Sequence, residues 1–140
     1  MFLAAFATTV MIGQFYPCTR PRHYDGDAIA CADVRWRRFA RNHSMRLAAI
    51  DAPEIRCFGG RACNTAGGRE ARDTLRRLTS NQPVRCAWNG TWAPGLSGRR
   101  PVVDCAVPRG ELGCLLVQTR HVEWMIKFDK NRLHRKRCAA

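Results

Sequence analysis

Eight cysteines in a chain of 140 residues constrain this fold more than any other feature of the sequence. Their number is even, no two stand as C-x-x-C, and the four histidines show no metal-ligand spacing. Zinc binding is therefore disfavoured, and disulfide bonds made in an oxidising compartment are favoured. Counting alone leaves many pairings open, so the connectivity has to be inferred from local structure.

Local structure predicts four disulfide bonds. The predicted pairs are Cys18–Cys31, Cys57–Cys63, Cys86–Cys105 and Cys114–Cys138. The first pair flanks the turn at Asp25-Gly26 symmetrically, so its cysteines would face each other in an antiparallel hairpin. The second pair shares one glycine-containing loop, and the third lies in two strands that we expect to pair. The fourth would fasten the C-terminus to the body of the domain.

The N-terminal segment, residues 1–14, is apolar and uncharged. Its stretch Phe2–Ile12 has the length of the hydrophobic region of an export signal. We interpret it as a signal peptide, which makes the protein secreted or periplasmic; a buried N-terminal strand is the alternative. No window of the sequence holds enough uninterrupted apolar residues for a stable membrane span.

The net charge of +13 comes from 24 basic and 11 acidic side chains, and 21 of the basic ones are Arg. A guanidinium matches phosphate in a bidentate way, so such a surface attracts polyanions such as nucleic acid, anionic lipid or acidic glycan. A GC-rich genome would explain the preference for Arg over Lys but not the size of the charge. The hydrophobic content of 46% is sufficient for one packed domain.

Runs of extended and amphipathic sequence predict the order of the elements. Strands are expected at 14–23, 27–35, 43–50, 84–88 and 101–107, helices at 69–80 and 111–120, and a loop at 89–98. Periodicity predicts an α+β domain, mainly β, with a small sheet. Three strands, a helix and two more strands is also the order of an OB-type five-stranded barrel with two to three helices. We assign residues 15–126 to this domain and 127–140 to a basic C-terminal tail.

Two short motifs hold four of the eleven carboxylates: Asp25-Gly26-Asp27 and Asp51-Ala52-Pro53-Glu54. In a chain this basic, grouped acids are candidates for binding a hard cation, and Ca²⁺ prefers several oxygen ligands. A metal held there would neutralise charge on a phosphate under attack, while a further carboxylate could activate the attacking water and arginines could clamp phosphate oxygens. The simpler alternative is that Asp25 and Asp27 only shape a turn.

Together with Arg46, five residues before Asp51, and Arg100 at the start of a strand, these motifs resemble the signature of the thermonuclease (staphylococcal nuclease-like) family. The resemblance covers residues 15–125, most of the chain. It implies a staphylococcal nuclease-like fold and a calcium-dependent endonuclease or exonuclease. Such an enzyme would hydrolyse DNA and RNA with little sequence specificity and leave 3′-phosphate ends.

The resemblance also assigns roles position by position. The metal ligands that it implies are Asp27, Asp51 and the backbone carbonyl of Ala52. The catalytic residues that it implies are Glu54 as general base, and Arg46 and Arg100 as ligands of the scissile phosphate. Arg99 is adjacent to Arg100 and is the alternative for that last role.

Two features of the sequence complicate this assignment. Ser97-Gly98-Arg99 replaces the tyrosine and lysine that precede the second arginine in the family, so nucleotide stacking would fall to Trp88, Trp92 or Trp124. Arg46 and Asp51 are five residues apart, which would put them on opposite faces of a continuous strand. The strand must therefore bend or end before Asp51.

The sequence leaves three classes of function open. A metal-dependent phosphodiesterase that acts on nucleic acid, expected as a monomer, is the first hypothesis. The second is a non-catalytic, basic OB-type nucleic-acid-binding protein, and the third and weakest is a surface protein that binds anionic lipid. The carboxylate cluster favours the enzyme, because a binder of phosphate gains nothing from acids that face it.

Overall fold

The computed structural model describes residues 10–33, 36, 44–57, 65–94, 99–129 and 132–139. The strands are β1 (Phe15–Pro17), β2 (Ala28–Ala30), β3 (Ser44–Leu47), β4 (Ile50–Asp51), β5 (Arg85–Ala93), β6 (Arg100–Val107), β7 (Gly110–Glu111) and β8 (Glu123–Trp124). The helices are α2 (Thr65–Thr79), α3 (Leu112–Gln118), α4 (Leu133–Ala139) and the short 3₁₀ helix η1 (Ile126–Phe128).

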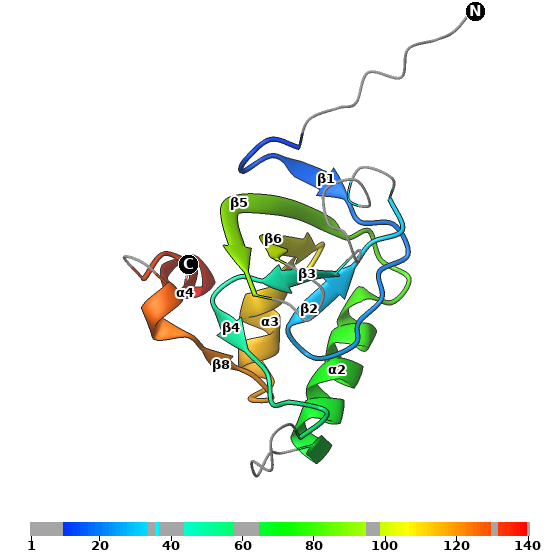
Figure 1. Cartoon of the computed structure of the whole chain (residues 1–140), viewed down its shortest axis with the longest axis vertical. Helices are drawn as coiled ribbons and strands as arrows, with labels where there is room; N and C mark the ends of the chain where they lie inside the picture. Colours follow the sequence, from blue (N-terminus) through cyan, green and yellow to red (C-terminus); the bar gives the residue numbers. More distant parts are fainter. Residues whose placement is uncertain are drawn as a thin grey trace, which may run out of the picture.

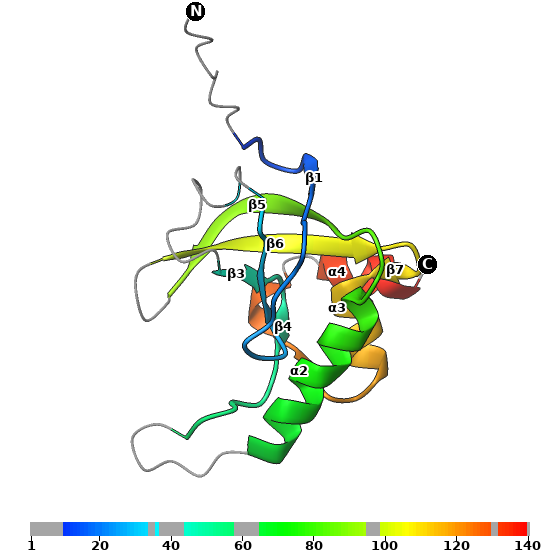
Figure 2. The same cartoon turned by 90° about the vertical axis from the view of Figure 1, so that its right-hand side faces the viewer.

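A mixed sheet with helices on one side forms the body of the molecule (Figures 1 and 2). Six strands belong to it, in the order β1-β5-β6-β3-β2 with β7 paired to β6, and β4 and β8 form a separate two-stranded sheet. The α+β class is therefore as predicted. Among the described residues no ladder joins the edge strands β1 and β2, so the sheet is open and is not a closed barrel.

Residues 15–17 pair with β5 and not with β2, which corrects the N-terminal part of the hairpin predicted from the sequence. Phe15–Pro17 lies opposite residues 85–87, and Tyr16 is buried beneath the sheet. Pro17 and Pro21 lack the backbone N–H that a continuous ladder to the next turn would need. Further along, Arg22 forms an isolated antiparallel bridge with Ala30, and the amide of Ala32 donates to the Thr19 carbonyl at 2.8 Å, so the two segments do meet in the antiparallel sense expected.

The fifth strand is longer than predicted, because β5 continues to Ala93 through a segment expected to be a loop. The register against β6 shifts between Trp88 and Trp92, and Gly90 adopts a φ of 87°. Such a conformation is easy for glycine and strained for other residues. The turn-forming residues of this segment therefore mark an irregularity within a strand.

The two main helices lie near their predicted positions. α2 starts at Thr65, earlier than the predicted 69, and buries Ala71 and Leu75 on its apolar face. α3 lies within the predicted 111–120, and its Leu112 and Leu116 are fully buried. None of the helices in the described ranges is both long and apolar enough to cross a membrane.

Three of the predicted disulfide bonds are confirmed. They are Cys18–Cys31, Cys86–Cys105 and Cys114–Cys138, with Cα–Cα distances of 5.0, 4.1 and 5.4 Å. Sulfur atoms of the first two lie within 4.8 Å of one another in the core. These bonds are compatible with an oxidising or extracellular location. Cys63 and residues 1–9 lie outside the described residues, so the Cys57–Cys63 bond and the export signal stay predictions.

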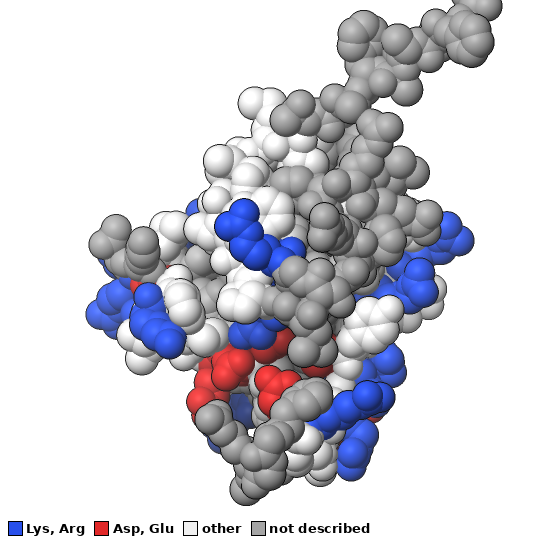
Figure 3. Space-filling model, in the orientation of Figure 1, with Lys and Arg blue, Asp and Glu red and all other residues white. Residues whose placement is uncertain are grey.

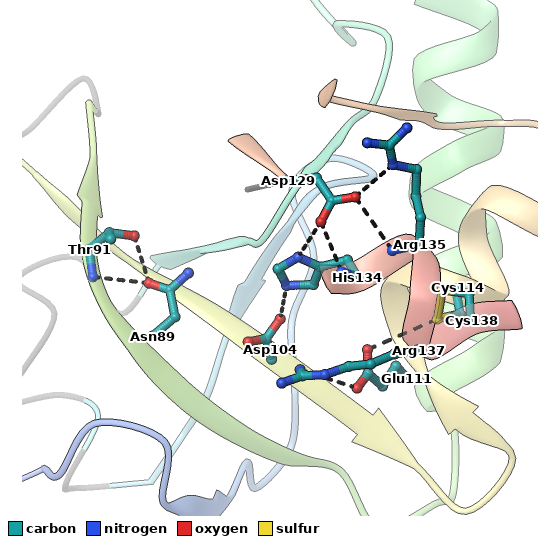
Figure 4. Close-up of polar contacts among 10 residues, drawn as sticks. All are labelled: Asn89, Thr91, Asp104, Glu111, Cys114, Asp129, His134, Arg135, Arg137 and Cys138. Atoms are coloured by element: carbon teal, nitrogen blue, oxygen red, sulfur yellow. Dashed lines mark hydrogen bonds and ion pairs between the residues drawn. A yellow bond between two sulfur atoms is a disulfide. The ribbon is translucent and has the colours of Figure 1, made fainter. Parts of the chain in front are cut away.

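The C-terminal tail folds back onto the body through the polar contacts drawn in Figure 4. His134 contacts Asp104 of β6 through Nε2 at 2.8 Å and Asp129 through Nδ1 at 3.2 Å. Its hydrogen bond with Asp104 raises the pKa of His134, although burial opposes this. Burial alone would raise the pKa of Asp129, but hydrogen bonds from Arg135 and His134 outweigh it and lower that pKa to about 2. Through these contacts the described residues 129 and 134–135 of the tail are packed against β6.

We expect the Cys114–Cys138 bond to contribute about 3 kcal/mol to the free energy of unfolding, because it closes a loop with a sequence separation of 24 residues. The double variant Cys114→Ser, Cys138→Ser should lower the urea midpoint, although the ion pair between Arg137 and Glu111 at 3.6 Å remains. Arg109→Ala, at an exposed turn, is the control and should leave the midpoint in place. A double variant as stable as the wild type would contradict this prediction.

Candidate active site

A tight turn before β2 places Asp27 against α2. The residue is 3% exposed, its backbone oxygen accepts a hydrogen bond from Leu47 N at 2.8 Å, and its amide donates to Asp25 Oδ1 at 3.3 Å. Gly26 allows the close approach, because a Cβ there would lie 2.5 Å from the Cβ of Ala71. The glycine of the first motif is therefore needed for packing on the helix, and it fixes the position of the buried carboxylate.

A turn between β3 and β4 brings Arg46 and Asp51 to the same side. β3 ends at Leu47, and Ala49 adopts a φ of 60°, a left-handed conformation that interrupts the alternation of side chains. β4 then begins at Ile50. The spacing of Arg46 and Asp51 requires a break in the strand, and the turn at Ala49 provides it. The break therefore lies before Pro53 and does not depend on that proline.

The guanidinium of Arg46 joins the two predicted metal-binding carboxylates. Its Nη1 lies 2.7 Å from Asp27 Oδ2 and its Nη2 lies 3.2 Å from Asp51 Oδ1. The same Nη2 donates to the Ile50 carbonyl at 3.0 Å, and the Ala52 amide donates to Asp27 Oδ2 at 2.9 Å. The turn before β2, strand β3 and the segment after β4 thus meet around one buried carboxylate oxygen.

Burial is the main reason why the pKa of Asp27 is raised to about 7. The negative charge of Asp25 adds to this effect, while the charge of Arg46 and the hydrogen bond from Ala52 oppose it. The side chain of Asp51, in contrast, is 55% exposed. One buried and one exposed carboxylate offer oxygen ligands of the kind that Ca²⁺ prefers, and a bound cation would favour the ionised form of Asp27.

Helix α2 also positions the segment that carries Glu54. A Cβ at Gly68 would lie 2.7 Å from the backbone oxygens of both Pro53 and Glu54, so the helix and this segment are in direct contact. The sequence predicts the helix only from residue 69, so Gly68 is expected in the loop before it. In the structure Gly68 is buried in the first turns of α2. Glu54 itself is exposed, two residues beyond the buried Ala52.

Arg100 lies on the same face of the sheet as Arg46. Strands β3 and β6 are parallel, with Arg46 opposite Val102, and side chains two residues apart on a strand share a face. The Nε of Arg100 donates to the Pro94 carbonyl at 3.1 Å, on the connection between β5 and β6. The two arginines named by the motif are therefore on adjacent strands and face the same side.

Arg99 lies beside Trp92, which is the most exposed of the three tryptophans proposed for stacking. Its guanidinium lies 5.2 Å from the centre of the Trp92 ring. Trp92 is 36% exposed, whereas Trp88 and Trp124 pack partly against the core. Trp92 and Arg99 thus form an exposed cation–π pair beside the start of β6.

One acidic residue beside the site is indicated by no motif. β4 pairs with β8, which puts Glu123 directly opposite Asp51, and opposing residues in an antiparallel pair lie side by side on one face. Figure 3 shows acidic side chains gathered in one patch over β4, with Lys and Arg on both sides. A pairing between such distant segments leaves no trace in periodicity, so the sequence could not have revealed Glu123.

Comparison with known proteins adds no assignment to this arrangement. No protein-family model and no curated protein matches the sequence. The resemblance to thermonucleases therefore depends on the motif residues themselves, and the chemistry of the site has to be judged from their geometry.

The raised pKa of Asp27 predicts that the protein loses stability as pH rises when divalent cations are absent. Between pH 3.8 and about 7 the folded protein retains a proton that the unfolded chain has released. Stability therefore falls as pH increases through this range. Asp27→Asn keeps the shape of the side chain and removes the titration, so its stability should decline less between about pH 5 and about pH 8.

Urea unfolding of both proteins in chelator measures this difference. His134, whose pKa is also raised, contributes a loss of stability in the same direction above its ordinary pKa, but it is present in both proteins and cancels. Parallel pH profiles for the wild type and Asp27→Asn would show that the carboxyl has an ordinary pKa.

Gly68→Ala tests the contact between α2 and the segment of Glu54. We expect it to lower the free energy of unfolding by about 1–3 kcal/mol, because the new methyl group would overlap two backbone oxygens that cannot easily move. Gly113→Ala in α3 is the matched control, since its Cβ would meet Ile50 Cγ2 at an ordinary 3.7 Å. That control should stabilise the helix by up to about 1 kcal/mol. Equal effects of the two changes on urea unfolding would exclude the close contact.

Proposed function

We propose that this protein is a calcium-dependent nuclease that hydrolyses DNA and RNA phosphodiester bonds with little sequence specificity, in the manner of the thermonuclease family that its motifs resemble. The observation that carries the proposal is the contact of Arg46 with both Asp27 and Asp51. This contact supports a metal site in which the buried carboxylate of Asp27, the exposed carboxylate of Asp51 and the guanidinium of Arg46 belong to one hydrogen-bond network.

In this proposal the carboxylates of Asp27 and Asp51 and the carbonyl of Ala52 hold the metal ion. Calcium bound there would neutralise negative charge that develops on the phosphate oxygens. Oxygen donors of this kind suit Ca²⁺ better than a softer metal. The buried oxygen of Asp27 accepts two hydrogen bonds from the protein, which fixes its direction before a cation arrives.

The remaining residues take roles in the attack on phosphorus. Glu54, exposed beyond the metal-binding segment, removes a proton from the attacking water. The water oxygen forms a new bond to phosphorus as the bond between phosphorus and the 5′-oxygen of the next nucleotide breaks, and that oxygen takes a proton from solvent water to leave as a hydroxyl. Arg46 and Arg100 donate hydrogen bonds to the non-bridging oxygens of the phosphate. A guanidinium carries five N–H donors, and within the described residues Arg46 contacts carboxylates only through Nη1 and Nη2, so N–H donors remain for a phosphate.

The expected substrate follows from the charge of the protein. A net charge of +13, dominated by Arg, attracts phosphate along the backbone of any nucleic acid. Backbone contacts carry no base information, so little sequence preference is expected. Trp92, next to Arg99, is the residue that we propose for stacking a base near the scissile phosphate.

The second candidate is a basic nucleic-acid-binding protein without catalysis. The exposed pair of Trp92 and Arg99 favours binding as such, because stacking and phosphate contact need no metal. The two candidates differ in what the carboxylates do. Only the enzyme requires Glu54 and Asp51 for turnover, and both side chains are exposed, so their replacement should not disturb the fold.

A nuclease assay on the oxidised protein, with calcium and then with excess chelator, tests the proposal. Glu54→Gln should lower the catalytic rate by about 10²-fold or more without weakening binding of a labelled oligonucleotide, because the base acts in the reaction and not in recognition. Arg100→Ala should cost on the order of 3 kcal/mol of transition-state stabilisation. Glu111→Gln, whose carboxylate contacts Arg137 of the tail, is the control and should keep the wild-type rate.

Each outcome of this assay separates the candidates. Hydrolysis that persists in chelator would overturn the metal-dependent mechanism. Oligonucleotide binding without hydrolysis in calcium would favour the non-catalytic protein. Wild-type rates in both Glu54→Gln and Arg100→Ala would mean that the site lies elsewhere.

A further inference from the structure

A hollow of about 400 Å³ lies where the chain before the Asp25 turn meets the C-terminal end of α2. Figures 1 and 2 both show the chain between β1 and β2 running beside this helix. Arg22, Tyr24 and Arg76 line the hollow together with residues 79–81. No role in the site described above accounts for them.

The charge of the hollow is positive. Arg22 is exposed and forms no ion pair within the part of the chain that the structure describes. Arg76 donates from Nη2 to the carbonyl of His23 at 3.1 Å, while its Nη1 lies 3.5 Å from Asp73. The end of a helix carries only about half a negative elementary charge. Asp73 offsets charge on Arg76, so the guanidinium of Arg22 is what keeps the hollow positive.

Tyr24 gives the hollow an aromatic surface. It is 65% exposed, and it lines the same hollow as Arg22 and Arg76. An exposed ring beside guanidinium groups is the combination by which proteins hold single-stranded nucleic acid, since every base has a face that stacks. The hollow therefore has the two elements that a nucleotide requires, one for phosphate and one for a base.

The floor of the hollow is fixed by a buried histidine. His23 Nδ1 donates to the Ala28 carbonyl at 3.0 Å, and Nε2 lies 2.9 Å from the Thr79 hydroxyl oxygen. Burial lowers the pKa of His23, which keeps the ring neutral. The contact with Thr79, together with the hydrogen bond from Arg76 to the His23 carbonyl, joins the segment of Tyr24 to α2, while the bond to Ala28 joins it to β2.

We propose that this hollow is a second subsite for single-stranded nucleic acid, in which Arg22 and Arg76 hold a backbone phosphate and Tyr24 stacks on a base. The inference rests on the proposed function, because it concerns a strand that also passes the carboxylate site. Tyr24 immediately precedes Asp25-Gly26-Asp27, so a strand bound at the turn continues over the ring. The subsite extends the contact to nucleotides away from the cleaved bond and makes longer strands better ligands.

The test measures binding of a fluorescein-labelled thymidine 12-mer in chelator, where hydrolysis plays no part. Arg22→Ala and Tyr24→Ala should each raise the Kd by about tenfold, whereas Tyr24→Phe, which keeps the ring, should bind as the wild type does. Arg109→Ala removes an exposed arginine elsewhere and should change the Kd by less than about twofold. An abasic 12-mer should lose the effect of Tyr24→Ala and keep that of Arg22→Ala.

Two outcomes would overturn the subsite. One is binding of the 12-mer that is unchanged in both Arg22→Ala and Tyr24→Ala. The other is a loss in Tyr24→Ala that is the same for the abasic strand, because the ring would then act on the fold and not on a base. In the proposed enzyme, cleavage of a dinucleotide in calcium should be unaffected by both changes. Absence of cleavage with the binding differences intact would reject the nuclease and keep the subsite.

Discussion

The candidate site depends on one interaction, the ion pair between the buried Asp27 and Arg46. The Oδ2 atom of Asp27 also accepts a hydrogen bond from the Ala52 amide. This single carboxylate therefore ties the turn before β2 to β3 and to the segment after β4. Removal of either charge would leave the other uncompensated in a poorly solvated place, which is costly. Burial raises the pKa of Asp27 to about 7, so the charged form of this carboxyl is disfavoured in spite of the guanidinium beside it. A cation at the site would favour the charged form, which would link metal binding to stability.

Helix α2 is the platform on which this interaction is built. Gly26 of the turn packs on Ala71, and Gly68 meets the backbone of Glu54, so both acidic motifs lie against the same helix at positions where no side chain fits. Near its other end the helix holds His23 through Thr79 and lends Arg76 to the hollow. The site and the proposed second subsite are therefore parts of one rigid element, and a strand of nucleic acid that follows α2 would meet both.

The sequence alone predicted much of this arrangement and missed parts of it for identifiable reasons. The spacing of cysteines around a turn gave Cys18–Cys31 correctly. The predicted hairpin is present only near that turn, because Pro17 and Pro21 prevent a continuous ladder and β1 pairs with β5. The glycine-rich start of α2 looked like a loop, since local propensity disfavours glycine in helices and the close packing that requires it is not local. The proposed closed barrel is not observed among the described strands.

The sequence by itself determined which residues are available: two acidic motifs, Arg46 and Arg100, and a large positive charge, all of them properties of composition and short spacing. Tertiary structure decided which of them meet. The left-handed turn at Ala49 brings Arg46 and Asp51 together, and burial distinguishes Asp27 from the exposed Asp51. It also added Glu123, through pairing of β8 with β4. Distances between remote segments and the exclusion of water arise only when the chain packs, so no local pattern could have given them.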